Sequence, residues 1–257
     1  MKEFENQWAI ILGGSSGLGL ASAKKLASQG MNICIVHRDR KSNLAAFEKE
    51  VKAMESFGVS VKTFNQDALS KDVRGAIVQE FPKNSVKLLL HSIAKGSLKT
   101  MRGSENETLS KQDLDITIHA MATSWYEWSQ TLIQDEIFTR KARNIAFTSE
   151  GNSRVWSGYG AVSAAKSVLE ALMRNMAVEF APLDITTNCI QAGTTETPSF
   201  LVIPGSEELA KMAKKRNPFG RLTQPEDVAN VVFLLCKKEA DWINGTILKV
   251  DGGESLR

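Results

Sequence analysis

The sequence predicts an α/β protein built on one doubly wound parallel sheet of about seven strands, with helices on both faces. From Gln7 onward, short apolar runs alternate with longer amphipathic segments, which is typical of repeated βα units. The first apolar run leads directly into a glycine-rich turn and then a helical pattern. No stretch rich in Gly, Pro or Ser divides the 257 residues, so we expect a single domain spanning 1–257.

Hydrophobic periodicity places the elements in order along the chain. The expected strands are short apolar runs, at residues 8–13, 31–37, 59–65, 86–92, 143–149, 185–191 and 246–250. The expected helices have an apolar face at helical spacing, at residues 17–29, 41–57, 70–80, 110–138, 157–180, 206–215 and 225–236. Since helices alternate with the strands, neighbouring strands should be joined by crossovers and run parallel.

Composition excludes several classes of protein. The formal charge of +3 is spread over 32 basic and 29 acidic residues without a basic block, which argues against nucleic acid and suits an anionic small ligand. No apolar run is long enough for a membrane span and the N-terminus lacks a signal-peptide pattern, so we expect a cytoplasmic protein. The cysteines lie far apart in apolar runs, which predicts buried reduced thiols rather than a metal site or disulfides, at Cys34, Cys189 and Cys236.

The turn after the first strand has the spacing of a dinucleotide-binding loop, with glycines in the pattern G-x-x-x-G-x-G before a helix. Glycine permits positive φ and close backbone approach, while the N–H groups of a helix N-terminus can bind a pyrophosphate. A tight βα turn without a ligand is the alternative. The Rossmann-type reading predicts cofactor contacts from Gly13, Ser15, Ser16, Gly17, Leu18 and Gly19.

The ends of the second and third strands lie where the adenosine half of such a cofactor would bind. Arg38 follows the second strand, and its guanidinium could pair with a 2′-phosphate, which favours NADP(H) over NAD(H). Asp39 argues the other way, and a solvated charge run is the alternative. Asp67, with Ala68 beside it, could accept a hydrogen bond from the adenine amino group, although aspartate is equally common at a helix start.

The fourth strand ends at His91, in the crevice where parallel sheets bind ligands. We expect His91 to be a hydrogen-bonded structural residue, and Ser92, Ile93 and Ala94 after it to contact the cofactor. The segment 110–138 carries His119 and several aromatic side chains. Aromatic residues on a helix pack more often in a core or subunit interface than against a ligand.

The segment 157–180 places a tyrosine and a lysine on one apolar-rich helix. Tyr159 and Lys166 are seven residues apart, within about 20° of two helical turns, so both side chains should project from one face. An ammonium near a phenol favours the phenolate, so we expect Lys166 to lower the pKa of Tyr159. Ser149, at the end of the fifth strand, could reach the same crevice. The alternative is a packed tyrosine and a solvated lysine.

A segment after the sixth strand, at about 194–216, is expected to form a substrate-covering lid. Gly193, Thr195 and Thr197 precede or open an apolar stretch at 200–203 that is bounded by prolines. Such a stretch is unfavourable in water unless it covers an apolar ligand or meets another subunit.

Together these residues resemble the short-chain dehydrogenase/reductase family, from about Gln7 to the C-terminus. The family's T-G-x-x-x-G-x-G turn is matched except at the threonine, which is Leu12 here. Its Asn-Asn-Ala-Gly strand end is replaced at 91–94, and its closing D-G-G is present at 251–253.

The resemblance implies roles for the residues that match. Lys166 would bind the nicotinamide ribose, while Gly193, Thr195 and Thr197 would flank the nicotinamide and the pyrophosphate. It also implies a homotetramer formed by pairing the segments 110–138 and 157–180, which makes two aromatic residues interface candidates, Trp125 and Trp128.

The spacing of the tyrosine and the lysine departs from the usual family pattern. In this feature the chain resembles the NADPH-dependent enoyl-acyl-carrier-protein reductase branch of that family. Most members have Y-x-x-x-K, but Val162 stands four residues before Lys166, and Tyr159 gives a Y-x6-K spacing. Ala192 before Gly193, in place of proline, resembles the same branch. In an enoyl thioester, hydride enters C3 while negative charge develops on the C1 carbonyl oxygen, so the acid must reach further. Moving the tyrosine back by three residues displaces it by about 4.5 Å, which is of the required order.

The implied function is an NADPH-dependent reductase of enoyl thioesters, carried by acyl carrier protein or CoA, in fatty acid biosynthesis. Tyr159 would stabilise the enolate oxygen. A carbonyl reductase such as a 3-oxoacyl thioester reductase, with Ser149 assisting the tyrosine, is the alternative enzyme. A non-catalytic NADP-binding regulator is the alternative from another class, which His91 and His119 favour because the family usually has asparagine there.

Overall fold

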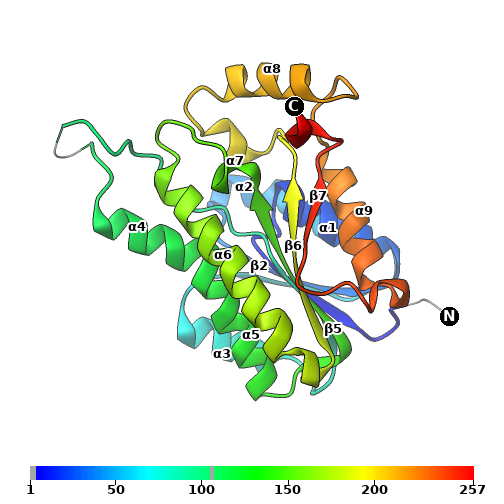
Figure 1. The fold of residues 1–257 in the computed structure, drawn as a ribbon. Coiled ribbons are helices and arrows are strands. Elements are labelled where there is room, and N and C mark those ends of the chain that lie inside the picture. Colours follow the sequence, from blue (N-terminus) through cyan, green and yellow to red (C-terminus); the bar gives the residue numbers. More distant parts are fainter. Residues whose placement is uncertain (1–3, 105–106) are drawn as a thin grey trace.

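The chain folds around a seven-stranded parallel sheet with helices on both faces (Figure 1). The computed structural model describes residues 4–104 and 107–257. The strand order is β3-β2-β1-β4-β5-β6-β7, which confirms the predicted doubly wound sheet. The strands are β1 (Trp8–Leu12), β2 (Asn32–His37), β3 (Val61–Asn65), β4 (Val86–His91), β5 (Phe138–Ser149), β6 (Ile185–Ala192) and β7 (Ile247–Val250).

Helices connect the strands much as the βα alternation predicts. Local signals set several of their starts: Ser110 and Asp113 form a capping box at α4, and Pro225 begins α9. The helices are α1 (Gly17–Ser28), α2 (Lys41–Glu55), α3 (Lys71–Val78), α4 (Lys111–Ile118), α5 (Ser124–Gln134), α6 (Gly160–Glu179), α7 (Pro198–Leu201), α8 (Ser206–Arg216) and α9 (Pro225–Cys236).

Two apolar layers hold these helices against the sheet. On one face, Leu26 of α1 and Val232 of α9 are fully buried, and the two helices pack side by side. On the other face, Trp125 and Trp128 of α5 are buried in one cluster with Leu169 of α6. Each buried side chain of this size stabilises the fold by about 1.5–3 kcal/mol relative to an exposed one.

The two tryptophans predicted as interface candidates therefore lie in the core, and that prediction was wrong. Trp125 Nε1 donates to Asn144 Oδ1 at 2.5 Å, and Trp128 Nε1 donates to the carbonyl oxygen of Ala68 at 2.8 Å. Both side chains are fully buried within the chain, so neither can reach another subunit. Aromatic spacing on a helix cannot distinguish packing on its own sheet from packing on a partner.

The expected helix at 110–138 is interrupted and ends early. After α4 the chain forms a π-helical turn, His119–Thr123, before α5 begins. Glu136 then adopts a left-handed φ of 57°, which redirects the chain into β5. Phe138 pairs with Val86 of β4, so β5 begins at Phe138 rather than at residue 143. Strand pairing overrides the polar residues that follow Phe138.

The strand order reverses between β1 and β4, since β1 pairs with both β2 and β4. In the register of these pairs Leu12 lies opposite His91, and Ser149 lies opposite Ala192. The carboxyl ends of β1, β4, β5 and β6 consequently meet at one edge of the sheet. This is the place where open parallel sheets bind ligands.

Two expectations from composition concern burial and membranes. All three cysteines are buried, and burial raises the pKa of the Cys34 and Cys189 thiols, which keeps these two groups protonated. Among the helices of residues 4–104 and 107–257, none combines the length and apolar character that a membrane crossing needs.

Candidate active site

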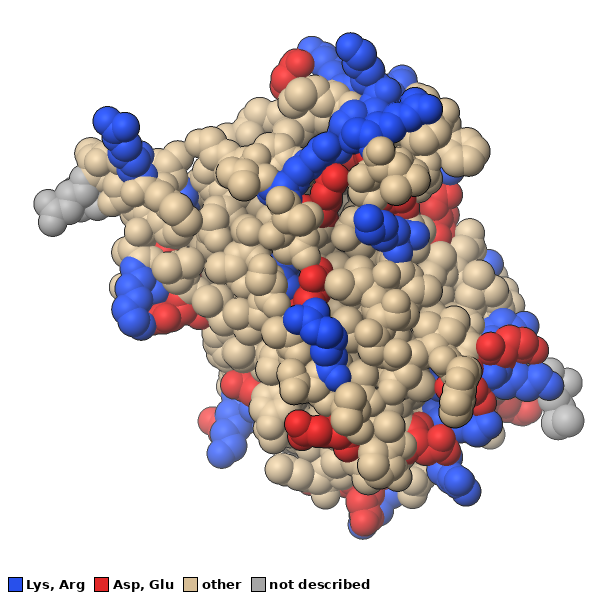
Figure 2. All heavy atoms as spheres, viewed as in Figure 1, with Lys and Arg blue, Asp and Glu red and all other residues tan. Residues whose placement is uncertain are grey.

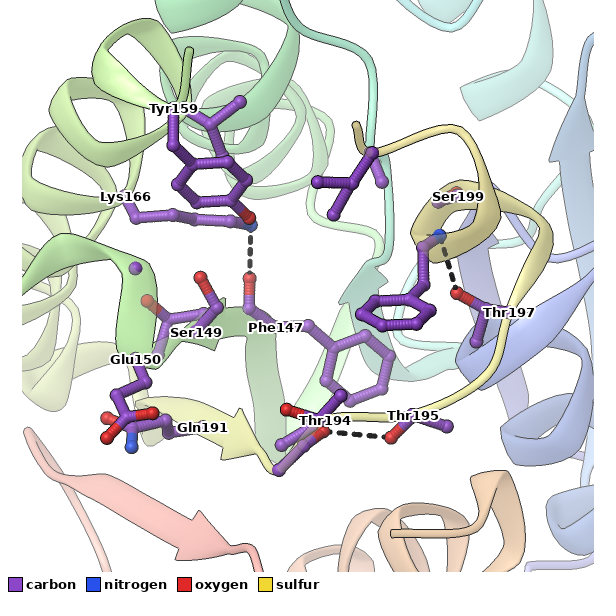
Figure 3. A pocket seen from close by; sticks show the side chains of 18 of the residues that line it. Phe147, Ser149, Glu150, Tyr159, Lys166, Gln191, Thr194, Thr195, Thr197 and Ser199 are labelled. Carbon is purple, nitrogen blue, oxygen red and sulfur yellow. Dashed lines mark hydrogen bonds between the residues drawn. The ribbon is translucent and has the colours of Figure 1, made fainter. Parts of the chain in front are cut away.

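A cavity of about 560 Å³ opens at the carboxyl ends of the central strands (Figure 3). Its lining includes most of the residues predicted from the sequence: Gly13, Ser16, Gly17, Leu18, Ser92, Ile93, Ala94, Ser149, Tyr159, Lys166, Gly193, Thr195 and Thr197. Five predicted contacts lie outside this lining: Ser15, Gly19, Arg38, Asp67 and Ala68. The fold thus brings the glycine turn and the predicted catalytic side chains to one site.

The glycine turn is shaped by close backbone contacts. Gly13 has a φ of +81°, and a Cβ there would lie 2.7 Å from the carbonyl oxygen of Ser92. A Cβ on Gly19 would overlap the carbonyl oxygen of Gly13. Both positions exclude a side chain, so the start of α1 sits directly against the end of β4. Gly17 and Leu18 bring the N–H groups of the first helical turn, which have no intrahelical acceptors, to the cavity.

Arg38 and Asp67 lie together at the ends of the adjacent strands β2 and β3. Arg38 Nη1 donates to Asp67 Oδ2 at 3.0 Å, and the two side chains are 61% and 42% exposed. Asp39, which argues against a phosphate ligand, instead accepts a hydrogen bond from His37 Nδ1 at 2.8 Å. The guanidinium is therefore accessible, but a phosphate there would share it with Asp67.

Tyr159 stands immediately before α6, which begins at Gly160, rather than within the helix as expected. Its ring packs edge-on against Trp156, with ring centroids 5.6 Å apart. The backbone of Gly151 lies so close that a Cβ on this residue would overlap the Tyr159 ring. These contacts hold the phenol at the cavity.

The pKa of Tyr159 differs from the expectation. Burial raises the pKa of the phenol above its usual value, and the nearby Ser149 hydroxyl lowers it in part. The predicted net lowering was wrong, because loss of water around the phenol dominates its pKa. The phenol is therefore protonated at neutral pH and acts as a hydrogen-bond donor.

Lys166 is buried in α6 and 6% exposed. Burial lowers the pKa of its ammonium to about 8, an effect opposed by the negative charge of Glu170. One N–H is used by the Phe147 carbonyl oxygen, so the ammonium retains donors for a ligand.

Ser149 closes β5 with its hydroxyl next to the phenol of Tyr159. The Oγ atom is buried, and none of the described residues makes a hydrogen bond of good geometry with it. The hydroxyl therefore retains hydrogen-bonding capacity for a ligand that reaches it.

His91 and His119 are not part of the cavity lining. His91 Nε2 lies 3.0 Å from Ser124 Oγ, and that hydroxyl donates to the carbonyl oxygen of Ala120. Burial lowers the pKa of His91 to about 3, so its ring is neutral and it is the buried, hydrogen-bonded residue that the sequence predicts. His119 is 41% exposed, with Nε2 3.5 Å from Glu127 Oε1.

Sequence reasoning missed a charged cluster along one wall of the cavity, formed by Glu150, Arg154, Arg216 and Glu254. Arg216 Nη2 lies 3.2 Å from Glu150 Oε2 and 3.0 Å from Glu254 Oε1. Arg154 Nε lies 3.5 Å from Glu150 Oε1. The available signal was adjacency, since Glu150 follows Ser149 and Glu254 follows the D-G-G motif.

The segment predicted as a lid contributes an apolar wall. Phe200, Val202, Ile203 and Met212 line the cavity, although Val202 is also 70% exposed, whereas Leu201 is 62% exposed and lies outside the lining. The apolar stretch therefore has one side toward the cavity and one toward solvent. Lys and Arg side chains gather over α8, which ends in three consecutive basic residues (Figure 2).

Comparisons with known proteins agree along almost the whole chain. Residues 13–255 match a family model described as Enoyl-(Acyl carrier protein) reductase. The chain is 29% identical to a probable 2,4-dienoyl-CoA reductase of Bacillus subtilis, with 98% of each protein covered. It is 25% identical to a 3-oxoacyl-acyl-carrier-protein reductase of Aquifex aeolicus, again with 98% of each covered. A short-chain dehydrogenase/reductase structure from Serratia marcescens is similar with a TM-score of 0.82 and 26% identity, covering 98% of this chain and 99% of that one.

Proposed function

This chain belongs to the short-chain dehydrogenase/reductase family, and from that membership we propose that it is an NADPH-dependent reductase of enoyl thioesters. Family members are oxidoreductases that bind NAD(P), so the chain is an oxidoreductase of this kind. The finer proposal is carried by the position of the tyrosine. Tyr159 lines the cavity next to Ser149, whereas Val162, where most members have their tyrosine, is an apolar lining residue.

The glycine turn fits the pyrophosphate of a dinucleotide. The first turn of α1 offers N–H groups at the cavity, and no side chain stands before them at Gly13 or Gly17. Thr197 faces this turn, since a Cβ on Gly17 would lie 3.1 Å from its Cγ2. We assign pyrophosphate binding to this turn, with hydroxyls from Ser15, Ser16, Thr195 and Thr197.

The remaining cofactor contacts follow from the same placement. Arg38 would bind a 2′-phosphate, with Asp67 and Ala68 next to the adenine, which supports NADPH over NADH. Ser92, Ile93, Ala94 and Gly193 would flank the nicotinamide, as cavity-lining residues at the ends of β4 and β6. When bound, NADPH supplies a hydride, which the substrate accepts at C3.

Tyr159 would act on the other end of the reacting system. Its protonated phenol donates a hydrogen bond to the thioester carbonyl oxygen, which gains negative charge as the enolate forms. A preorganised donor of this kind contributes about 10² to 10³ in rate. Lys166 would hold the ribose hydroxyls with the donors that the Phe147 carbonyl oxygen leaves available.

The lid and the basic face of α8 support an acyl thioester as substrate. Phe200 and Ile203 offer apolar contacts to an acyl chain within the proposed lid, 194–216. The basic end of α8 suits the negative charges of an acyl carrier protein or of CoA phosphates (Figure 2).

A specific observation favours a second candidate, a 3-oxoacyl thioester reductase. The Ser149 hydroxyl lies next to the Tyr159 phenol, and a serine and tyrosine together can polarise a ketone oxygen. The relative from Aquifex aeolicus is named as a reductase of this kind.

Turnover of two matched substrates tests the proposal. Oxidation of NADPH should be faster with crotonyl-CoA than with acetoacetyl-CoA, by about tenfold or more in kcat/KM. The reason is that Tyr159 is proposed to stabilise the thioester oxygen of the enolate, which forms only in enoyl reduction. A preference for acetoacetyl-CoA would support the second candidate. Tight NADPH binding with no reduction of either thioester would indicate a non-catalytic NADP-binding regulator.

For the assembly, we propose a homotetramer formed by the outward faces of α4, α5 and α6. Exposed apolar side chains on these faces include Ile116 of α4 and Val178 of α6, which are 48% and 75% exposed. Sedimentation of a monomer at micromolar concentration would contradict this assembly.

A further inference from the structure

We propose that Glu254 is a positioning residue, because its carboxylate holds the first and last residues of the lid, Thr194 and Arg216, at one point. We call this arrangement, with Glu150, the lid clasp. Its role in substrate binding rests on the function proposed above, whereas the fixing of the lid ends follows from contacts alone.

The first end of the lid is held by two hydrogen bonds. Thr194 N donates to Glu254 Oε2 at 3.0 Å, and Thr194 Oγ1 donates to Glu254 Oε1 at 2.7 Å. Thr194 lies just beyond the end of β6, so these bonds fix the point at which the chain leaves the sheet. Glu254 is 3% exposed, and the low local dielectric strengthens both bonds.

The last end of the lid reaches the same carboxylate. Arg216 is the final residue of α8, and its Nη2 atom lies 3.0 Å from Glu254 Oε1 and 3.2 Å from Glu150 Oε2. The Arg216 side chain is 19% exposed, so both contacts are largely shielded from water. Charge-assisted hydrogen bonds of this kind are about twice as strong as neutral ones.

Glu150 connects the lid clasp to Ser149 and Tyr159 (Figure 3). It directly follows Ser149, and the next residue, Gly151, packs against the ring of Tyr159. Movement of Arg216 away from the cavity would therefore break its contact with the chain segment that places Ser149 and Tyr159.

The middle of the lid is held less tightly than its ends. Leu201 and Val202 are exposed, and the ion pair within α8, Lys211 with Glu208 at 3.8 Å, is exposed on both sides. An exposed pair of this kind contributes little. A lid fixed at its ends lets Phe200 adjust to an acyl chain while the cavity wall stays in place.

Limited digestion with trypsin tests the lid clasp without any substrate. Glu254→Gln should be cleaved about tenfold faster at the exposed lysines of α8, because a looser end raises the population of the open helix. Glu208→Gln is the matched control and should be cleaved like the wild type, since it removes an exposed ion pair from the same helix. If Glu254→Gln does not fold, Thr194→Val replaces it in the test. Trypsin should cleave Thr194→Val faster than the wild type but more slowly than Glu254→Gln, because only one hydrogen bond is lost.

Kinetics distinguish positioning from a general loss of structure. Glu254→Gln should raise KM for crotonyl-CoA about tenfold, with a smaller change in kcat and in NADPH affinity. Arg216→Gln combined with Glu254→Gln should raise KM by less than the product of the two single effects, since each single variant already removes the contact that the two side chains share. Wild-type trypsin sensitivity in Glu254→Gln and Thr194→Val, or additive effects in the double variant, would overturn the proposal. Faster digestion of Glu254→Gln, with no reduction of either thioester by the wild type, would support the clasp and contradict the proposed function.

Discussion

The two sides of the cavity are built differently. The cofactor side takes its shape from neighbouring residues of one turn, Gly13 to Gly19, where missing side chains allow the backbone to approach. A second wall is assembled from Glu150, Thr194, Arg216 and Glu254, which come from four separate segments and are held by paired side chains. Substitutions in the turn should therefore weaken cofactor binding, whereas substitutions in or next to the second wall should affect substrate binding and turnover.

Gly19→Ala should have the largest effect on the cofactor side. Its Cβ would overlap the Gly13 carbonyl oxygen, so the turn must shift, and overpacking of this kind should weaken NADPH binding by about a hundredfold. Fluorescence titration with NADPH measures the change. Gly75→Ala in α3 is the control, because a Cβ there meets no atom within 4 Å. Equal weakening in both variants would contradict the close-packed turn.

Gly151→Ala, next to Glu150 of the second wall, should lower turnover without weakening cofactor binding. The added methyl group would displace the Tyr159 ring, so kcat should fall about tenfold or more while NADPH affinity stays near the wild-type value. Gly103→Ala is the matched control, since its Cβ would make only ordinary contacts. A Gly151→Ala variant that lost NADPH binding and kept kcat would remove the distinction between the two sides.

Arg38→Ala should have a smaller effect that depends on the cofactor. Loss of a charge-assisted contact to the 2′-phosphate should weaken NADPH binding about tenfold and leave NADH binding unchanged. Exposure of Arg38 and its pairing with Asp67 limit the effect. Lys83→Ala, which also removes an exposed ion-paired cation, should leave both affinities unchanged. If Arg38→Ala still prefers NADPH as strongly as the wild type, residues other than Arg38 determine the preference.

The pH dependence of NADPH binding should show the smallest effect. The pKa of Lys166 is lowered to about 8 in the free protein, and a bound ribose would favour its charged form and raise that pKa. NADPH affinity should therefore be highest below pH 8 and fall severalfold as pH rises through this value. Lys166→Met should bind more weakly and lose this dependence. The same pH profile in both proteins would exclude Lys166 as its source.

The sequence predicted the parts of the site that depend on local pattern. Hydrophobic alternation predicted the seven-stranded sheet, and glycine spacing predicted which turn would lie at the cavity. These features depend on residues that are close together in the chain, so the local sequence is sufficient to predict them.

Long-range packing explains what the sequence did not reveal. The pKa of Tyr159 depends on burial by distant segments, and helical spacing alone suggested the opposite direction. Trp125 lies in the core because it pairs with Asn144 of β5, a contact that no periodicity indicates. Glu254 and Arg216 meet only once the sheet has placed their segments together.

The most direct test of the proposed mechanism is single-turnover oxidation of NADPH by the wild type, Tyr159→Phe and Ser149→Ala. With crotonyl-CoA, Tyr159→Phe should lower the rate by about 10² to 10³ at unchanged NADPH affinity, because one oxyanion donor is lost. Ser149→Ala should lower it much less. Near wild-type reduction of crotonyl-CoA by Tyr159→Phe, together with loss of acetoacetyl-CoA reduction in Ser149→Ala, would contradict the enoyl reductase assignment.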